Sequence, residues 1–230
     1  MADPARGPAV LVMARVPRPS AEPGPLEAAL GSQCWSALQQ ALLSRVITWA
    51  QEVSPDAVYV AYEPLEAGAD AGELAGADAG QLAGPDVTTF PQDGSDMTQR
   101  LARAAGRVFE AGHTPVLIAW PDLPRWRPDH AAGALSDLAD GCGISVGPVF
   151  DGGFYLVALA GPLAPLFELP SRTWRGADGM VLAFEAANSA GIEVGLLRAE
   201  RGLHSLEDMR AALADPLLDP ELRDLLPSAE

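Results

Sequence analysis

The stretch that decides the fold is VGPVFDGGFYLVAL, Val146–Leu159. Two apolar runs flank the break Asp151-Gly152-Gly153, so the pattern predicts a strand, a turn and a second strand. Asp-Gly is a strong hairpin signal. Glycines also let a backbone approach a ligand closely, while the carboxylate binds it. From these residues alone, the break is either an ordinary hairpin or the floor of a ligand site.

Outward from this stretch, short apolar runs alternate with segments of helical periodicity. The expected strands span residues 8–14, 57–62, 87–90, 115–120 and 192–197, and the expected helices span 26–53, 96–111, 128–139, 177–190 and 205–213. Strands that alternate with helices favour a mostly parallel sheet covered on both faces. The sequence therefore predicts an α/β fold, a single Rossmann-like domain over residues 8–213. A C-terminal tail or short helix is expected at 214–230.

One segment departs from this alternation. AGADAGEL and AGADAGQL, residues 67–82, form a near-duplicate pair of octets rich in small and acidic residues. Frequent glycine weakens a helix, and few large apolar groups are present to anchor the segment. We interpret residues 64–86 as a flexible acidic Gly/Ala insertion at the surface rather than as a cation site.

Composition limits the classes of partner. The 230 residues carry a formal net charge of −16, and every basic residue is arginine. Such a surface repels nucleic acid and anionic membranes, and the absence of lysine excludes Schiff-base chemistry or a lysine phosphate clamp. No apolar run approaches the roughly 18 residues of a membrane span. The two cysteines show no ligand-like spacing, and no export signal is evident, so we expect a cytoplasmic protein.

Candidate chemistry lies where strands end. In open α/β sheets, ligands bind beyond the carboxyl ends of the strands. Asp122 follows the expected strand 115–120, and Asp151 follows the next one. A carboxylate at the position of Asp122 could coordinate Mg²⁺ or Mn²⁺. The alternative is that Asp122 only caps the turn in PDLP.

The order of the pieces resembles a known family. The pieces are VLVMARVPRP, FPQDGSDMTQRLARA, VLIAWPDLP, VGPVFDGGFYLVAL, a lone tryptophan before a helix, and SLEDM. Together they resemble bacterial GT-A glycosyltransferase-like proteins of unassigned function, also described as radical-SAM/selenodomain-associated transferases. That family is similar to molybdenum-cofactor and phospholactate guanylyltransferases. The resemblance implies a GT-A (nucleotide-diphospho-sugar transferase-like) fold that binds a nucleotide or nucleotide sugar with a divalent metal, Mg²⁺ or Mn²⁺.

The resemblance also implies roles for individual residues. Asp122 would bind the metal and, with Asp151, form the catalytic pair, in which Asp151 holds the acceptor or a second metal. The residues that the resemblance assigns to nucleotide and phosphate binding are Gln92, Asp96, Arg100, Gly152, Gly153, Tyr155 and Trp174.

The sequence departs from the family pattern in the segment expected to bind phosphate (the phosphate grip) and in the residues expected to bind the metal. The family has Lys-Thr-Arg-Leu after the first-strand loop, where this chain has Pro23-Gly24-Pro25 before its leucine. Two carboxylates near the end of the family's domain are replaced by the stretch Gly202–Ser205. His204 could supply one metal ligand in their place. Arg15 and Arg18 could hold phosphates in place of the missing grip.

Two hypotheses follow. The first is a metal-dependent nucleotidyl- or glycosyltransferase-like protein with an altered phosphate-binding loop. The second is a catalytically degenerate GT-A domain, a pseudoenzyme that binds or scaffolds, either as a homodimer or with a protein partner. Trp126, between Arg125 and Arg127, could serve such an interface or could simply fold onto its own domain.

Overall fold

The structure, a computed structural model, describes residues 6–17, 23–63, 80–174 and 176–227. Helices and strands alternate along most of the chain, as the sequence predicts. The strands are β1 (Ala9–Ala14), β2 (Val58–Tyr62), β3 (Thr88–Pro91), β4 (Val116–Ala119), β5 (Ile144–Pro148), β6 (Phe154–Leu159) and β7 (Val194–Leu196). The α-helices are α1 (Pro25–Leu30), α2 (Ser32–Val53), α4 (Met97–Glu110), α5 (Pro128–Ala139), α6 (Gly179–Ser189), α7 (Leu206–Ala214) and α8 (Pro220–Leu225). Two 3-10 helices are η1 (Ala164–Glu168) and η2 (Ser171–Trp174).

The strands form a seven-stranded sheet in the order β3-β2-β1-β4-β6-β5-β7. β6 is antiparallel to both of its neighbours, β4 and β5, and the other pairs are parallel. The mostly parallel α/β sheet predicted from the sequence is therefore confirmed. β5 and β6 form the hairpin that contains the Asp151-Gly152-Gly153 break.

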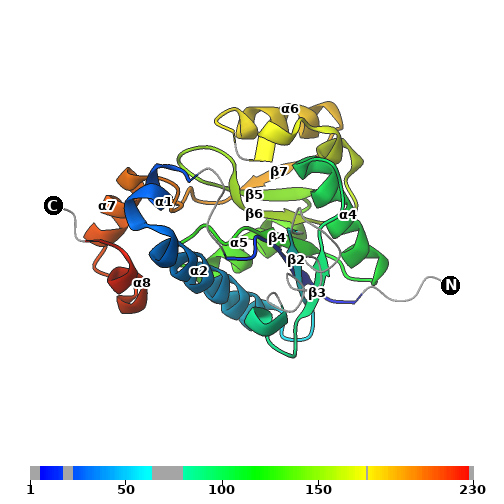
Figure 1. The fold of residues 1–230 in the computed structure, drawn as a ribbon. Coiled ribbons are helices and arrows are strands. Elements are labelled where there is room, and N and C mark those ends of the chain that lie inside the picture. The colour runs from blue at the N-terminus through cyan, green and yellow to red at the C-terminus, as the bar shows by residue number, and fades with distance from the viewer. Residues whose placement is uncertain (1–5, 18–22, 64–79, 175, 228–230) are drawn as a thin grey trace.

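Helices cover both faces of the sheet (Figure 1). One apolar cluster joins one face to α4, η1, η2 and α6. A second cluster joins the opposite face to α2 and α5. Because β1 and β4 are buried on both faces, each reads as a continuous apolar run rather than an alternating one.

A third apolar cluster joins helices from the first and last quarters of the chain. It joins α1 and the start of α2 to α7 and α8, and it includes the buried side chains of Leu218, Leu222 and Leu226. Figure 1 shows α7 and α8 beside α1. The segment predicted as a tail or short helix is thus a short helix packed into the domain. Of the three buried leucines, Leu222 lies within α8, and Leu218 and Leu226 lie on either side of this helix.

Two local predictions differ from the structure. The helix expected at 26–53 is divided into α1 and α2 at Gly31, whose φ of 75° lies in the left-handed region that favours glycine. Within the predicted flexible insertion, residues 64–79 lie outside the described residues. Residues 80–83 form a helical turn, and Ala83 is buried against the α2 face of the sheet.

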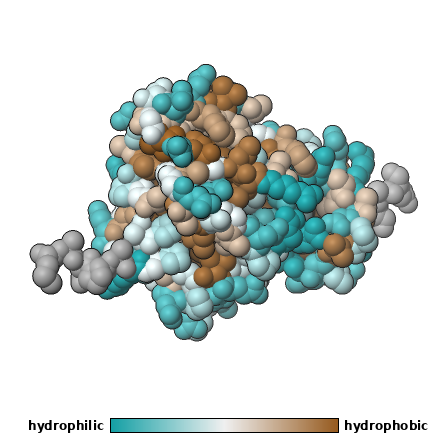
Figure 2. Space-filling model, turned by 180° about the vertical axis from the view of Figure 1, so that it is seen from behind, coloured by the Kyte–Doolittle hydropathy of each residue, from teal (hydrophilic) through white to brown (hydrophobic). Residues whose placement is uncertain are grey.

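The surface is mixed. On the face shown in Figure 2, apolar groups form separate patches among hydrophilic residues. Among the described residues, the large apolar side chains that remain exposed are Phe150, Val181, Leu196 and Leu217. Within the described parts of the chain, no helix combines the length and apolar character that crossing a membrane requires.

Candidate functional site

The carboxyl ends of β1 and β4 lie side by side, and the β5–β6 hairpin ends next to them. Trp120, directly after β4, donates its backbone N–H to the carbonyl of Tyr155 in β6 (3.1 Å). Within the hairpin, Val149 N–H donates to the carbonyl of Gly153 (3.2 Å), and Gly152 N–H donates to that of Val149 (3.1 Å). These bonds fix the two loops that carry the predicted carboxylates.

The glycines of the hairpin are required by its backbone and its surroundings. Gly152 has φ of 99° and Gly153 has φ of 79°. A Cβ at Gly152 would lie 2.6 Å from the Cα of Ala177. The turn can therefore form only with a residue that lacks Cβ and tolerates positive φ.

A third loop, residues 201–205, brings His204 to the same place. Leu203 N–H donates to the carbonyl of Asp122 (2.9 Å). Asp208 in α7 accepts from the backbone N–H groups of His204 (3.3 Å) and Ser205 (3.0 Å). It also accepts from Arg201 Nη1 (2.9 Å), and its side chain is only 8% exposed. Burial alone would raise the pKa of Asp208, but these hydrogen bonds outweigh it and lower the pKa.

The imidazole of His204 lies between the two predicted carboxylates. Its Nδ1 is 2.6 Å from Oδ2 of Asp151, and its Nε2 is 3.4 Å from Oδ2 of Asp122. Burial by itself lowers the pKa of His204, but the two carboxylates raise it to about 9. Asp122 contributes more than Asp151 despite its longer distance; its side chain is 29% exposed, against 45% for Asp151. At neutral pH, His204 is therefore a cation held between two anions.

Two cavities meet at this cluster. One, of about 290 Å³, is bordered by aromatic side chains and by all three members of the cluster: Trp120, Asp122, Val149, Asp151, Gly152, Phe154, Trp174 and His204. The other, of about 170 Å³, lies toward β1 and α2, and its residues are Met13, Arg15, Trp35, Gln39, Leu42, Leu43, Pro121, Asp122, Leu203 and His204. Asp122 and His204 form a wall of both.

The imidazole of His204 separates the two carboxylates of the cluster. The two nitrogens of an imidazole point to opposite sides of the ring, and here each faces a different carboxylate. A single ion therefore cannot contact both carboxylates while the ring stands between them. Among the described residues, no group of three or more His, Cys, Asp or Glu side chains could hold a metal ion. Asp122 Oδ2 and His204 Nε2, which belong to the two predicted metal ligands, lie 3.4 Å apart, and their role as ligands stays a prediction.

The candidate phosphate ligands have partners of their own. Arg15 lies 3.1 Å from Glu63, and its side chain is 56% exposed. Arg100 Nη1 lies 2.5 Å from the other carboxylate oxygen of Glu63, and Arg100 Nε donates to the carbonyl of Gly94 (3.2 Å). Arg18 lies outside the described residues. Arg15 is thus the predicted phosphate ligand that the structure places on a cavity.

Other predicted nucleotide ligands have structural contacts. Gln92 is buried and donates to the backbone carbonyls of Ala14 (3.1 Å) and Ala61 (2.9 Å), which ties β1 to β2. Asp96 caps α4 by accepting from the backbone N–H of Gln99 (2.9 Å). Neither Gln92 nor Asp96 borders the two cavities described above.

The two predicted aromatic ligands lie on different faces of the sheet. Trp174 borders the larger cavity, stacks near Trp120 with ring centroids 6.4 Å apart, and donates from Nε1 to Thr98 (2.8 Å). Tyr155 is buried on the opposite face, and its hydroxyl donates to the carbonyl of Arg198 (3.2 Å). Burial raises the pKa of Tyr155.

Sequence reasoning missed Glu63 and the residues of the smaller cavity. Glu63 directly follows β2, the same strand-end position that singled out Asp122, so the signal for it was present. Trp35 and Gln39 lie one helical turn apart in α2 and carried no comparable signal. Trp126 packs onto its own domain, against Trp49, with ring centroids 4.2 Å apart.

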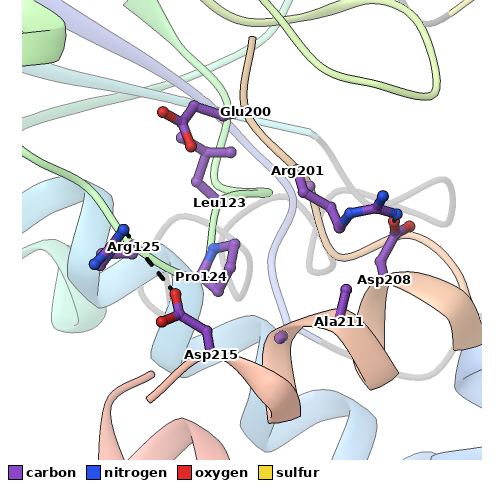
Figure 3. Close-up of a pocket in the computed structure, with 10 residues that line it drawn as sticks. Leu123, Pro124, Arg125, Glu200, Arg201, Asp208, Ala211 and Asp215 are labelled. Atoms are coloured by element: carbon purple, nitrogen blue, oxygen red, sulfur yellow. Dashed lines mark hydrogen bonds and ion pairs between the residues drawn. The ribbon is translucent and has the colours of Figure 1, made fainter. Parts of the chain in front are cut away.

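A further cavity of about 220 Å³ is bordered by Arg201 and Gly202 of the 201–205 loop and by residues of α7 (Figure 3). Arg125 faces Asp215 across it at 4.0 Å, and Arg201 turns toward Asp208. Glu200, which also borders the cavity, pairs instead with Arg127. The pair of Arg201 with Asp208 holds the loop that carries His204.

Comparisons with known proteins agree with this architecture. Residues 46–174, more than half of the chain, match the family described as "Uncharacterized protein conserved in bacteria (DUF2064)". The chain belongs to that family. A comparison with curated proteins gives no match.

Solved structures share the fold at low sequence identity. One, from Desulfovibrio desulfuricans G20, is provisionally described as a nucleotide-diphospho-sugar transferase. It is 20% identical with a TM-score of 0.71, over 95% of this chain and 93% of that one. A 4-diphosphocytidyl-2C-methyl-D-erythritol synthase is 12% identical with a TM-score of 0.57, over 96% of this chain and 99% of that one. The domain therefore has a nucleotide-diphospho-sugar transferase-like (GT-A) fold.

Proposed function

We propose that this DUF2064 protein is a transferase-like domain that binds a nucleotide or nucleotide sugar in the two cavities on either side of Asp122 and His204. The observation that carries the proposal is the meeting of three separate loops at one cluster of charged side chains, between two cavities at the carboxyl ends of the strands. This is where open α/β sheets bind their ligands.

The two cavities suit different parts of such a ligand. The larger one combines Trp120, Phe154 and Trp174 with the carboxylates of Asp122 and Asp151, and aromatic faces with carboxylate acceptors suit a sugar ring and its hydroxyl groups. The smaller cavity contains Arg15, so it is the side on which a phosphate would be held.

Arg15 is free to exchange its partner. Its pair with Glu63 is exposed, and such surface ion pairs contribute about 0–1 kcal/mol. A charge-assisted hydrogen bond to a phosphate contributes about 1.5–3 kcal/mol. A phosphate that displaced Glu63 from Arg15 would therefore gain more than it lost.

The binding test is a calorimetric screen of nucleosides, nucleotides and nucleotide sugars, with and without Mn²⁺. Arg15→Gln should weaken a phosphate-bearing ligand by about tenfold to a hundredfold and leave the matching nucleoside unchanged. Arg103→Gln is the matched control, because Arg103 is also 56% exposed and also forms a surface pair, with Asp93. Equal effects of the two substitutions would contradict the proposal.

A second substitution tests the other side of the site. Asp122→Asn should weaken binding. Asp56→Asn should not, because Asp56 lies in an exposed turn before β2, at the amino ends of the strands. Release of nucleoside diphosphate from a bound nucleotide sugar would then distinguish a transferase from the second candidate, a binding domain without turnover. That candidate is favoured by the pairing of both His204 nitrogens with carboxylates and of Arg100 with Glu63, which leaves few cationic groups apart from Arg15 available for a phosphate.

A further inference from the structure

We infer that the His204 ring takes the place of a divalent cation between Asp122 and Asp151, so that the two carboxylates are bridged without a metal ion. The inference concerns the cluster itself; its consequence for ligands, binding that needs no metal, rests on the proposed function.

The first argument is geometric. The ring fills the space between the carboxylates, with Nδ1 at 2.6 Å from Asp151 and Nε2 at 3.4 Å from Asp122. Carboxylate oxygens only accept hydrogen bonds, so a nitrogen that faces one must donate its own hydrogen. A ring that donates from both nitrogens has no lone pair left to coordinate a metal.

The second argument is that the chain holds the ring in this position. Leu203 N–H bonds to the carbonyl of Asp122 at 2.9 Å, and Asp208 accepts the N–H of His204 at 3.3 Å. Gly202 leaves space for the ring, since a Cβ there would lie 2.8 Å from its Cε1. The loop is therefore shaped around an imidazole that bridges two loops by hydrogen bonds, as a metal would bridge them by coordination.

The third argument is charge. Two carboxylates that share a site repel each other unless a cation separates them. The ring supplies that cation from within the chain. Its replacement by a carboxylate should turn the cluster into three oxygen ligands whose repulsion a bound cation relieves, which is the donor set that Mn²⁺ and Mg²⁺ take.

The experiment measures Mn²⁺ binding by electron paramagnetic resonance, on the full chain. The wild-type protein should bind no Mn²⁺ at this site. His204→Asp should bind Mn²⁺ at least about tenfold more tightly than the control variant does through its surface carboxylates. Arg210→Asp is the matched control: it makes the same change of charge at an exposed position of α7, away from the cluster, and should not create a site. The double variant His204→Asp/Asp122→Asn should lose the new binding.

Three results would overturn the inference. One is Mn²⁺ binding by the wild-type protein that Asp151→Asn abolishes, a measurement that needs no variant of His204. Another is a His204→Asp protein that folds, by circular dichroism, but binds no more Mn²⁺ than Arg210→Asp does. The third is a nucleotide that stabilises the wild-type protein only when Mn²⁺ is present. If no nucleotide or nucleotide sugar binds under any condition, the proposed function fails, and the Mn²⁺ measurements still decide the inference.

Discussion

The raised pKa of His204 predicts a specific pH dependence of stability. Its pKa is about 9 in the folded protein, against an ordinary value of 6.5. Because the folded value is the higher one, the protonated ring stabilises the fold. That contribution is complete below pH 6.5 and is lost as the pH rises through about 9.

The size of the effect follows from the shift and the exposure. At about 1.4 kcal/mol per pKa unit, the full shift corresponds to roughly 3 kcal/mol. The His204 side chain is 35% exposed, so solvent screens its interactions with both carboxylates. We therefore expect about 1–2 kcal/mol of stabilisation to be lost between pH 6.5 and pH 9.5.

The assay is urea unfolding of the wild-type protein and His204→Gln at intervals from pH 6 to pH 10. Glutamine keeps hydrogen-bonding groups but carries no charge, so the difference between the two proteins isolates the ring's titration. That difference should be largest at pH 6 and should fall toward zero by pH 10. A difference that stays constant, or grows with pH, would refute the reasoning. The ring's own titration by NMR provides an independent value of the pKa.

Three other substitutions test how the site is held. Gly202→Ala should push the His204 ring away from the carboxylates, so the pKa of His204 measured by NMR should fall toward 6.5 while the overall fold, by circular dichroism, is retained. Gly152→Ala should destabilise the protein by about 2–4 kcal/mol in urea unfolding, because Gly152 has φ of 99° and the new Cβ would lie 2.6 Å from the Cα of Ala177. An unchanged unfolding midpoint would contradict this prediction. Asp208→Asn should cost about 1.5–3 kcal/mol at pH 7, and this difference from the wild type should vanish in acid, since the lowered pKa of Asp208 gives stability that is present above pH 3.8 and lost as the pH falls through the folded value.

The sequence predicted those parts of the site that depend on strand ends. Asp122 and Asp151 each follow an apolar run, and parallel or hairpin strands place such positions at a common edge. Each was a candidate for a ligand site as well as for a turn residue, and both border the same cavity. The carboxylate positions could be anticipated because they depend on local pattern and topology.

The surroundings of the residues assigned by the resemblance depend on the fold. Successive residues of a strand point to opposite faces, so Phe154 and Tyr155 cannot both face the larger cavity. In the structure, Phe154 borders it and Tyr155 is buried on the face covered by α2 and α5. Gln92 could not be placed from sequence, because its role depends on carbonyls of two other strands that only the fold brings within reach.

The exchange of a metal for an imidazole changes what the site can offer a ligand. A divalent ion carries two charges and keeps open positions for phosphate oxygens. The His204 ring carries one charge, and both of its nitrogens already face carboxylates. The ring therefore bridges the two carboxylates, but it has no N–H group left to donate to a phosphate. A phosphate must then depend on Arg15, on the far side of the Asp122–His204 wall, and the carboxylates remain available to accept hydrogen bonds from a sugar. A chain of this kind should discriminate between ligands by their hydroxyl groups more than by their number of phosphates.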